Sequence, residues 1–371
     1  MFRPSDIIVV GAGVVGCAVA YELARAGASV QVVEERATGM GATWASAGIL
    51  APYIEAEGSE FLELTVRSLR LFDEFIGRVS AESGIAVAYH RTGTLQVATD
   101  PAQMAVFRNR AAQLEAQGVQ LAVLDEQTVR AEEPHLGGDV CGALLVPGHG
   151  FVAVDDYTRA LAAAARHHGA QIIEGGRVRR VTGRAGEIVV ETDRGPLSAD
   201  AVVMAAGTWS GHIEIAGVRA RVPVRPVRGQ LLRLAWRGVP LRRVTWSERC
   251  YLVPWTDGTL LVGATVEEAG FDEQATVAGV RDLLDAACEA VPHAWTAGFL
   301  GARVGLRPAT PDGLPIVGAS RAVANLMYAT GHYRNGILLS PLTAKLVADA
   351  MLDGRVDPAM HMLRPERFGE L

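Results

Sequence analysis

Cysteine is scarce in this chain of 371 residues, and its cysteines form no recognisable site. They are Cys17, Cys141, Cys250 and Cys288. No two of them make a CxxC pair, and none has a histidine at metal-ligand spacing. We therefore expect four reduced thiols, with neither a disulfide nor a bound metal ion.

The chain also lacks the charge pattern of nucleic-acid-binding proteins and the long apolar run of membrane proteins. Lys and Arg number 35 against 41 Asp and Glu, a formal net charge of −6, and no basic run alternates with aromatic residues. Three glycines interrupt the first apolar run, which argues against a signal peptide or a membrane span there. We expect a cytoplasmic protein that binds neither nucleic acid nor membrane.

Glycine, in contrast, is abundant. The chain has 41 glycines among its 371 residues, about 11%, which exceeds the usual share of about 7%. Glycine is required where the backbone turns tightly or comes close to another group. The rest of the composition, 49% apolar and 20% charged, is that of an ordinary globular protein long enough for two domains.

The first 34 residues have the pattern of a dinucleotide-binding βαβ unit. A β-rich run at 7–10 precedes Gly11, Gly13 and Gly16 in a GxGxxG motif, and the pattern predicts a helix over 17–26 and a strand over 29–33. The glycines permit a tight turn, close approach to a pyrophosphate at the helix N-terminus, and close helix–strand packing. Glu34 can accept hydrogen bonds from ribose hydroxyls, which disfavours NADP, but the motif does not separate NAD from FAD.

A run of small residues follows at 38–49. It favours a backbone wrapped closely on a large flat ligand, although an ordinary glycine-rich loop has the same composition. Further along, apolar spacing predicts helices over 61–83, 104–117, 155–168 and 277–291. Short β-rich runs predict strands over 93–98, 170–174, 230–234, 250–253 and 259–262, with a basic turn over 177–180.

Residues 200–211 have the pattern of a buried parallel strand that runs into a glycine turn. The carboxyl end of such a strand is where an open α/β sheet binds its ligand. The cofactor fold is therefore expected to resume after residue 150, so that a second domain is built from insertions.

Arginines and a tyrosine in the second half are candidate ligands. Tyr251 stands between apolar neighbours, and a buried tyrosine needs a partner for its hydroxyl. Arg303 and Arg307 lie in a segment rich in glycine and proline, and Arg334 precedes an amphipathic helical pattern over 337–347. Arginines in such settings are most often members of structural ion pairs, with ligand binding as the alternative.

Together these motifs resemble the D-amino acid oxidase family of FAD-dependent amine oxidoreductases, and within it the glycine oxidase branch of the thiamine pathway. The motifs that carry the resemblance are VVGAGVVGCAVAYELA, ASAGIL, VVMAAGTWSG, CYLVP with VGAT, GLRPATPDGLPIVG and GHYRNGILLSP. They extend over nearly the whole chain.

The resemblance implies an α/β fold, in which an FAD-binding Rossmann-like domain of the GR2 type carries an inserted α+β substrate domain with an antiparallel sheet. The FAD domain would comprise residues 1–76, 150–216 and 305–371, and the substrate domain residues 77–149 and 217–304.

The resemblance also implies site residues. Arg307 would pair with the substrate carboxylate, with Tyr251 and Arg334 nearby. FAD would contact Gly11, Gly13, Val14, Val15, Gly16, Glu34, Glu35, Ala42, Thr43, Ala47, Gly48, Ile49, Val178, Gly207, Trp209, His332, Tyr333, Arg334, Asn335, Gly336, Ile337 and Leu338. Of these, Glu34 and Glu35 would lie near the adenosine ribose.

The implied reaction is the oxidative deamination of glycine, sarcosine or other small or N-substituted amino acids. Hydride would pass from Cα to the flavin, the imine would hydrolyse, and oxygen would be reduced to hydrogen peroxide. Two alternatives from the same family stay open: a D-amino acid dehydrogenase that reduces a quinone or a protein partner, and a flavoprotein subunit of a heteromeric amine-oxidising complex. A homo-oligomer is expected by resemblance alone.

Two departures from the family pattern bear on the site. Sarcosine oxidases attach flavin covalently through a cysteine in a CLYTMTPD-like segment, where this chain has GLRPATPD with Gly305 in the cysteine's place. Non-covalent FAD is therefore expected. Tyr53 and Ile54 replace small and polar residues and are expected to shape the entrance, and Val266 and Arg249 are expected to line or flank the pocket.

Overall fold

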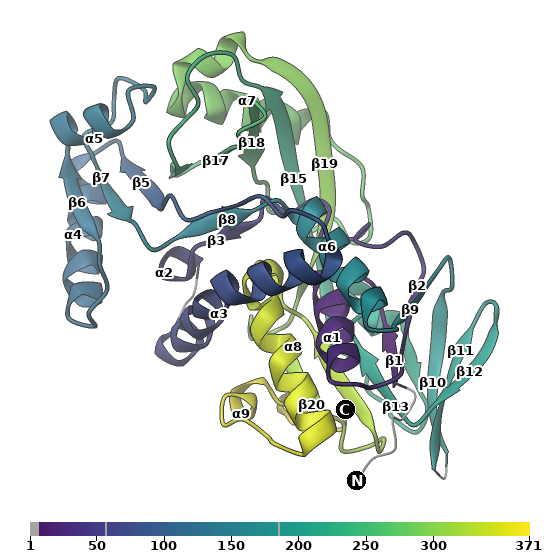
Figure 1. Cartoon of the computed structure of the whole chain (residues 1–371). Coiled ribbons are helices and arrows are strands. Elements are labelled where there is room, and N and C mark those ends of the chain that lie inside the picture. The colour runs from purple at the N-terminus through teal and green to yellow at the C-terminus, as the bar shows by residue number, and fades with distance from the viewer. Residues whose placement is uncertain (1–6, 56–57, 185) are drawn as a thin grey trace.

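The chain folds around a six-stranded sheet and an eight-stranded sheet (Figure 1). A computed structural model describes residues 7–55, 58–184 and 186–371. Residues 1–6, where the predicted FAD domain begins, lie outside the described residues.

The six-stranded sheet joins distant parts of the chain. Its order is β20 (Ile316–Ala319), β21 (Leu326–Thr330), β13 (Ala201–Met204), β1 (Ile7–Val10), β2 (Val30–Glu34) and β9 (Gln171–Glu174). All neighbours are parallel except β20 and β21. The strand predicted near residue 200 is therefore β13, hydrogen-bonded directly to β1 as the cofactor fold requires.

Both faces of this sheet are buried, and alternate residues of β1 divide between them. Ile7 and Val9 pack against a layer of helices, whereas Ile8 and Val10 pack into a second core on the opposite face. Successive strand side chains point to opposite faces, so a strand covered on both sides must be apolar throughout. This explains the continuous apolar run at 7–10.

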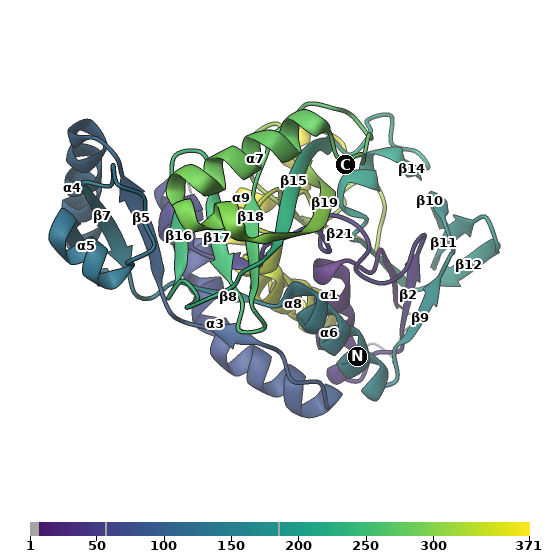
Figure 2. The same ribbon diagram turned by 90° about the horizontal axis from the view of Figure 1, so that it is seen from above.

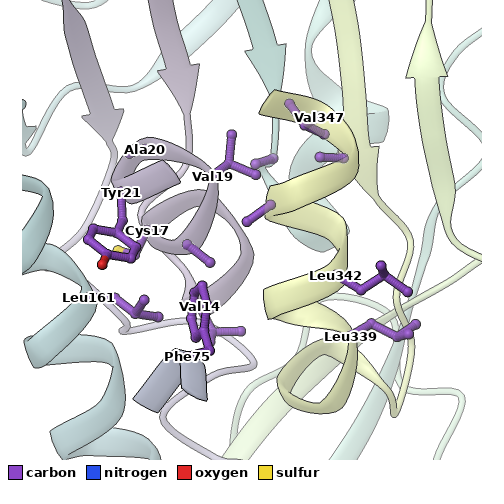
Figure 3. Close-up of a cluster of buried hydrophobic side chains, with 14 of the residues drawn as sticks. Val14, Cys17, Val19, Ala20, Tyr21, Phe75, Leu161, Leu339, Leu342 and Val347 are labelled. Carbon is purple, nitrogen blue, oxygen red and sulfur yellow. The ribbon is translucent and has the colours of Figure 1, made fainter. Parts of the chain in front are cut away.

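Four helices cover the first face: α1 (Val14–Arg25), α3 (Ser59–Ser83), α6 (Val154–His167) and α8 (Gly336–Asp353). Figure 3 shows α1 between α6 and α8, with Val19 directed toward α8 and Tyr21 toward α6. The helix predicted over 17–26 begins three residues earlier, at Val14 after the N-cap residue Gly13, so Gly16 lies in its first turn and faces the carbonyl oxygen of Gly11.

The last long helix, α8, is more deeply buried than the amphipathic pattern indicated. Residues 337–344 are buried without interruption, which is typical of a helix in the core. Pro341 stands inside the helix and removes one backbone hydrogen bond. The hydroxyl of Ser340 donates to the Ile337 carbonyl oxygen at 2.8 Å and so satisfies the acceptor that Pro341 leaves free.

The opposite face is covered by a smaller sheet of β12 (Gly195–Ala199), β11 (Glu187–Thr192), β10 (Val178–Arg184) and β14 (Glu214–Ile215). The basic turn predicted over 177–180 was wrong, because β10 starts at Val178. A bulge between Val178 and Arg180 lets Val178 and Val181 both reach the core while the arginines between them point outward.

The eight-stranded sheet is antiparallel except for the pair β16–β5. Its order is β19 (Gly298–Ala309), β15 (Arg225–Ala235), β18 (Thr259–Gly263), β17 (Tyr251–Pro254), β16 (Val244–Trp246), β5 (Thr94–Ala98), β7 (Gly142–Val146) and β6 (Ala122–Asp125). Helix α7 (Val277–Ala290) and the short helix η2 (Pro292–Thr296) pack on one face. Strand β15 extends beyond the predicted 230–234, and β19 was not predicted; the two strands pair with each other over their whole length.

Shorter elements complete the structure. Helices α4 (Pro101–Glu115) and α5 (Glu126–Glu132) accompany β5–β7 at one end of the molecule, opposite β10–β12 (Figure 2). A three-stranded sheet of β3 (Ile49–Leu50), β8 (Gly150–Val152) and β4 (Tyr89–His90) lies near α2 (Pro52–Glu55). The remaining helices are α9 (Met360–Leu363), η1 (Gly207–His212) and η3 (Pro365–Phe368).

The division into two domains stays a prediction, and β19 runs without a break through the proposed boundary at residue 305. In the described ranges, no helix combines the length and the apolar character that crossing a membrane requires.

The contact between Gly16 and Gly11 predicts opposite effects for two helix glycines. A Cβ at Gly16 would lie 1.9 Å from the Gly11 carbonyl oxygen, whereas one at Gly77 in α3 would meet nothing within 4 Å. Gly77→Ala should stabilise the protein by about 0.5–1 kcal/mol through helix propensity. Gly16→Ala should destabilise it by about 1–3 kcal/mol, because backbone has to move. Thermal unfolding of the two variants checks this, and equal melting temperatures would contradict it.

Candidate active site

A cavity of about 520 Å³ is lined by residues of both large sheets and by the turn before α8. One part of its wall lies at the carboxyl ends of β1, β2 and β13, and another on the surface of β15, β17, β18 and β19. The volume is in the range of small-molecule sites. The position at the carboxyl ends of parallel strands is the one where open α/β sheets bind nucleotides.

Glu34 is held in place at the end of β2 by backbone groups. The N–H of Ala12 donates to Oε2 of Glu34 at 2.7 Å, and the N–H of Arg36 donates to Oε1 at 2.8 Å. A carboxylate oxygen can accept further hydrogen bonds. The fixed carboxylate therefore fits the predicted role of accepting from ribose hydroxyls.

The N-terminus of α1 is prepared for an anion. Gly13 is its N-cap residue, and no acidic residue stands in its first turn. A Cβ at Gly11 would lie 2.6 Å from the carbonyl oxygen of Ala205, so only glycine allows the β1–α1 turn to approach the end of β13. The positive end of the helix dipole and the nearby backbone fit a pyrophosphate.

The small-residue loop at 38–49 is fixed to its surroundings. The Gly39 N–H donates to the Ala12 carbonyl oxygen at 2.8 Å, and the Val152 N–H donates to the Gly48 carbonyl oxygen at 2.9 Å. Arg303 donates to the carbonyl oxygen of Trp44 at 2.8 Å and forms an ion pair with Asp155 at 2.8 Å. Arg303 therefore stabilises this loop and is already paired, so it is not a candidate ligand.

Arg307 lies flat on the eight-stranded sheet because the neighbouring strand has a glycine. A Cβ at Gly229 of β15 would lie 2.3 Å from Nη2 of Arg307. The guanidinium donates to the Thr265 carbonyl oxygen at 3.0 Å. Within the described part of the chain it has no carboxylate within 4.0 Å, so its charge faces the cavity without a counter-ion.

Tyr251 also lies over a glycine of the neighbouring strand. It pairs with Gly263 across β17 and β18, and a Cβ at Gly263 would lie 2.4 Å from the Tyr251 hydroxyl oxygen. The two glycines thus let Arg307 and Tyr251 converge over the centre of the sheet. Burial raises the pKa of Tyr251 to about 12, so its hydroxyl remains a hydrogen-bond donor at neutral pH.

The turn before α8 brings the C-terminal motif to the same cavity. Tyr333 has a left-handed backbone, with φ of 48°, and its N–H donates to the Pro308 carbonyl oxygen at 2.9 Å. Arg334 is exposed on the cavity wall. His332 is buried, with Nε2 3.0 Å from the Thr343 hydroxyl, and burial lowers the pKa of His332 to about 3. It is a neutral support for the turn.

The sequence interpretation missed Glu55, which lines the cavity with Arg307 and Arg334. It had singled out Tyr53 and Ile54, neither of which lies on the cavity wall. Successive helix residues differ in direction by about 100°. In α2, Tyr53 therefore points away from the cavity and stacks on His149, with 5.4 Å between the two ring centroids, while Glu55 faces the cavity. The available signal was an acidic residue after ASAGIL with no basic residue within four positions.

The predicted site residues lie on the cavity wall except for Gly16, Asn335 and Leu338. Gly16 faces Gly11, Asn335 is the buried N-cap residue of α8, and Leu338 belongs to the core. Val266 and Arg249 do line the cavity, as expected. Gly229 and Gly263 were not singled out, although glycine inside a strand marks close approach of another group.

Comparison with known proteins agrees with this geometry. The family model of the FAD dependent oxidoreductases, DAO, matches residues 6–350. Glycine oxidase of Geobacillus kaustophilus is 34% identical over 348 residues, which is 93% of this chain and 92% of the relative. The crystal structure of glycine oxidase from Geobacillus kaustophilus has a TM-score of 0.90 at 32% identity and covers 95% of this chain and 96% of its own.

Two further relatives differ in length or in the substrate that they are named for. Iminodiacetate oxidase from Chelativorans sp. BNC1 has a TM-score of 0.88 at 26% identity, covering 97% of this chain and 98% of its own. The bifunctional protein ThiO/ThiG of Synechocystis sp. is 35% identical over 377 residues, which is 99% of this chain but 55% of the relative. The chain thus spans about half the length of this bifunctional protein. A shared family model and end-to-end similarity show that the chain belongs to the FAD dependent oxidoreductase (DAO) family.

Proposed function

We propose that this FAD-dependent oxidoreductase oxidises the Cα–N bond of glycine, sarcosine or another small or N-substituted amino acid. The observation that carries the proposal is Arg307, a guanidinium on the cavity wall without a counter-ion among the described residues. Such a cation needs an anionic ligand, and its planar fork matches a carboxylate with two charge-assisted hydrogen bonds. Tyr251 can donate a third.

The chemistry that follows is that of an amino acid held by its carboxylate. FAD, which the β1–α1 turn, Glu34 and the small-residue loop would hold, would supply the acceptor for the two electrons of the Cα–H bond, with oxygen as the final oxidant and hydrogen peroxide as the product. Arg307 and Tyr251 orient the substrate so that Cα faces the small-residue loop, and the imine product is hydrolysed by water. The similar glycine and iminodiacetate oxidases are both named for substrates with a CH₂ between an amine and a carboxylate.

A substrate panel tests the reaction class. The purified yellow protein should release peroxide in air with glycine or sarcosine, and we would compare D-alanine, D-proline and N-ethylglycine. Turnover with a dye acceptor but without peroxide would replace the oxidase by a dehydrogenase. Absence of turnover with every member of the panel would reject the proposed substrate class.

Two variants test the carboxylate anchor in different ways. Arg307→Ala should lower kcat/KM about 100-fold, because two charge-assisted hydrogen bonds worth about 3 kcal/mol are lost. Gly229→Ala should lower acetate affinity at least about tenfold with little change in melting temperature, because the Cβ displaces only the flexible end of Arg307.

The matched controls are Arg281→Ala, an exposed arginine of α7 paired with Asp282, and Gly298→Ala, whose Cβ would make an ordinary 3.4 Å contact in β19. Acetate binding is followed by the change in the flavin absorption spectrum. Unchanged acetate affinity in Arg307→Ala would show that another group holds the carboxylate.

The attachment of FAD is predicted to be non-covalent. Gly305 stands where related sarcosine oxidases carry the attaching cysteine, and a Cβ there would lie 2.7 Å from the Cβ of Ala45. The site therefore has no room for a cysteine side chain without movement of the loop. Mass spectrometry of the denatured protein should give the mass of the polypeptide alone, and a mass increased by one FAD would contradict the prediction.

A further inference from the structure

The carboxyl group of Glu55 shares the cavity with two arginines but forms no ion pair with either. Arg307 and Arg334 both line the cavity with it, and both act on it electrostatically. Yet no nitrogen of either arginine lies within 4.0 Å of its oxygens, and no described side chain donates a hydrogen bond to it. Three charged groups therefore surround a space that none of them fills.

The surrounding charges suit a ligand with one negatively charged end and one positively charged end. A carboxylate satisfies Arg307, and the ammonium group of the same amino acid then needs an acceptor one or two bonds away. Among the described residues, Glu55 is an acidic side chain that interacts electrostatically with Arg307, Arg334 and Tyr251. It can only accept hydrogen bonds when ionised.

We propose that Glu55 accepts a proton from the ammonium group of the bound amino acid. An N–H bond of the substrate breaks and an O–H bond forms on the carboxylate, so no electrons change hands in this step. The amine is left neutral with a free lone pair. Loss of hydride from Cα requires that lone pair, because it becomes the second bond of the imine. This inference rests on the proposed function and names its proton acceptor.

The titration of Glu55 suits that role. Burial raises the pKa of Glu55 to about 7, against the opposing effect of Arg334 and Arg307. A base works best when its pKa is near the working pH. Below pH 7 Glu55 is protonated and cannot take the proton, so substrate oxidation should be slow in acid and rise through neutral pH.

Two titratable groups near Glu55, Tyr251 and His149, have pKa values far from 7. On the cavity side, the pKa of Tyr251 is raised to about 12, and arginines stay charged. Behind α2, Arg110 of α4 donates to the Tyr53 carbonyl oxygen, and burial lowers the pKa of His149 to about 3. On α3, which packs against α2, Glu60 and Glu63 are exposed.

The test compares the pH dependence of flavin reduction in four proteins carrying FAD. They are the unaltered protein, Glu55→Gln, Glu55→Asp and the control Glu248→Gln, a cavity-rim carboxylate that already accepts from Gln103 at 3.0 Å. Glycine and sarcosine are mixed anaerobically with each protein between pH 5.5 and 9. The unaltered protein and the control should show a rate that rises tenfold per pH unit below about 7 and then levels.

Glu55→Gln should be about 100-fold slower at pH 7, and its rate should continue to rise toward the pKa of the free amine. Glu55→Asp should retain a levelling profile at a shifted midpoint. If Glu55→Gln keeps the profile of the unaltered protein, the proposal is overturned.

Acetate binding separates proton transfer from a structural effect. Acetate has a carboxylate but no ammonium, so Glu55→Gln should bind it at least as tightly as the unaltered protein, because a negative charge near Arg307 is removed. Loss of acetate binding would instead make Glu55 a support of the site and overturn the proposal. Failure of the unaltered protein to be reduced by any amino acid would reject the proposed function itself.

Discussion

At Gly16 the backbone of α1 comes so close to the carbonyl oxygen of Gly11 that a Cβ would lie 1.9 Å from it. The same requirement for a residue without a Cβ recurs on the eight-stranded sheet, where Arg307 lies over Gly229 and Tyr251 over Gly263. Close packing leaves no room for an extra methyl group in such contacts. Glycine at these points therefore lets α1 pack against the β1–α1 turn and lets Arg307 and Tyr251 lie against the sheet surface.

Arginines that form ion pairs with carboxylates can be distinguished from an arginine that faces the cavity. Arg228 is buried and pairs with Glu267 and Asp272, and Arg303 pairs with Asp155. Arg307, four residues after Arg303 on β19, donates only to backbone carbonyl oxygens among the described residues. A buried charge is costly unless it is paired. Arg307 and Glu55, which have no ion-pair partner among the described residues, are the features on which the proposal of a zwitterionic ligand rests.

The two sheets contribute different properties to the site. The parallel sheet contributes the N-terminus of α1, backbone N–H groups and Glu34, which suit a dinucleotide. The antiparallel sheet contributes long side chains lying along its surface, which suit a small polar ligand. Strand β19 connects them, since Gly305 packs against Ala45 of the small-residue loop while Arg307 faces the opposite strand. A single strand therefore joins the two parts of the cavity wall.

Local patterns were enough to predict the βαβ unit and most of the long helices. The GxGxxG motif, Glu34 and the loop at 38–49 follow one another closely in sequence, so a local window contains them together. Periodicity also predicted α3, α6 and α7 to within a few residues. It failed for β10, for the length of β15 and for the existence of β19, because a bulge and long-range pairing are not visible in a local window.

The sequence by itself determined that a dinucleotide fold is present and that Arg307, Tyr251 and Arg334 are candidate ligands. Only the tertiary structure decided which arginines are paired and which are not, because the partners lie far apart in the chain. Asp155 is 148 positions from Arg303. It also decided that Glu55, and not Tyr53, faces the cavity, since the direction of a side chain on a single helical turn depends on how that turn is packed.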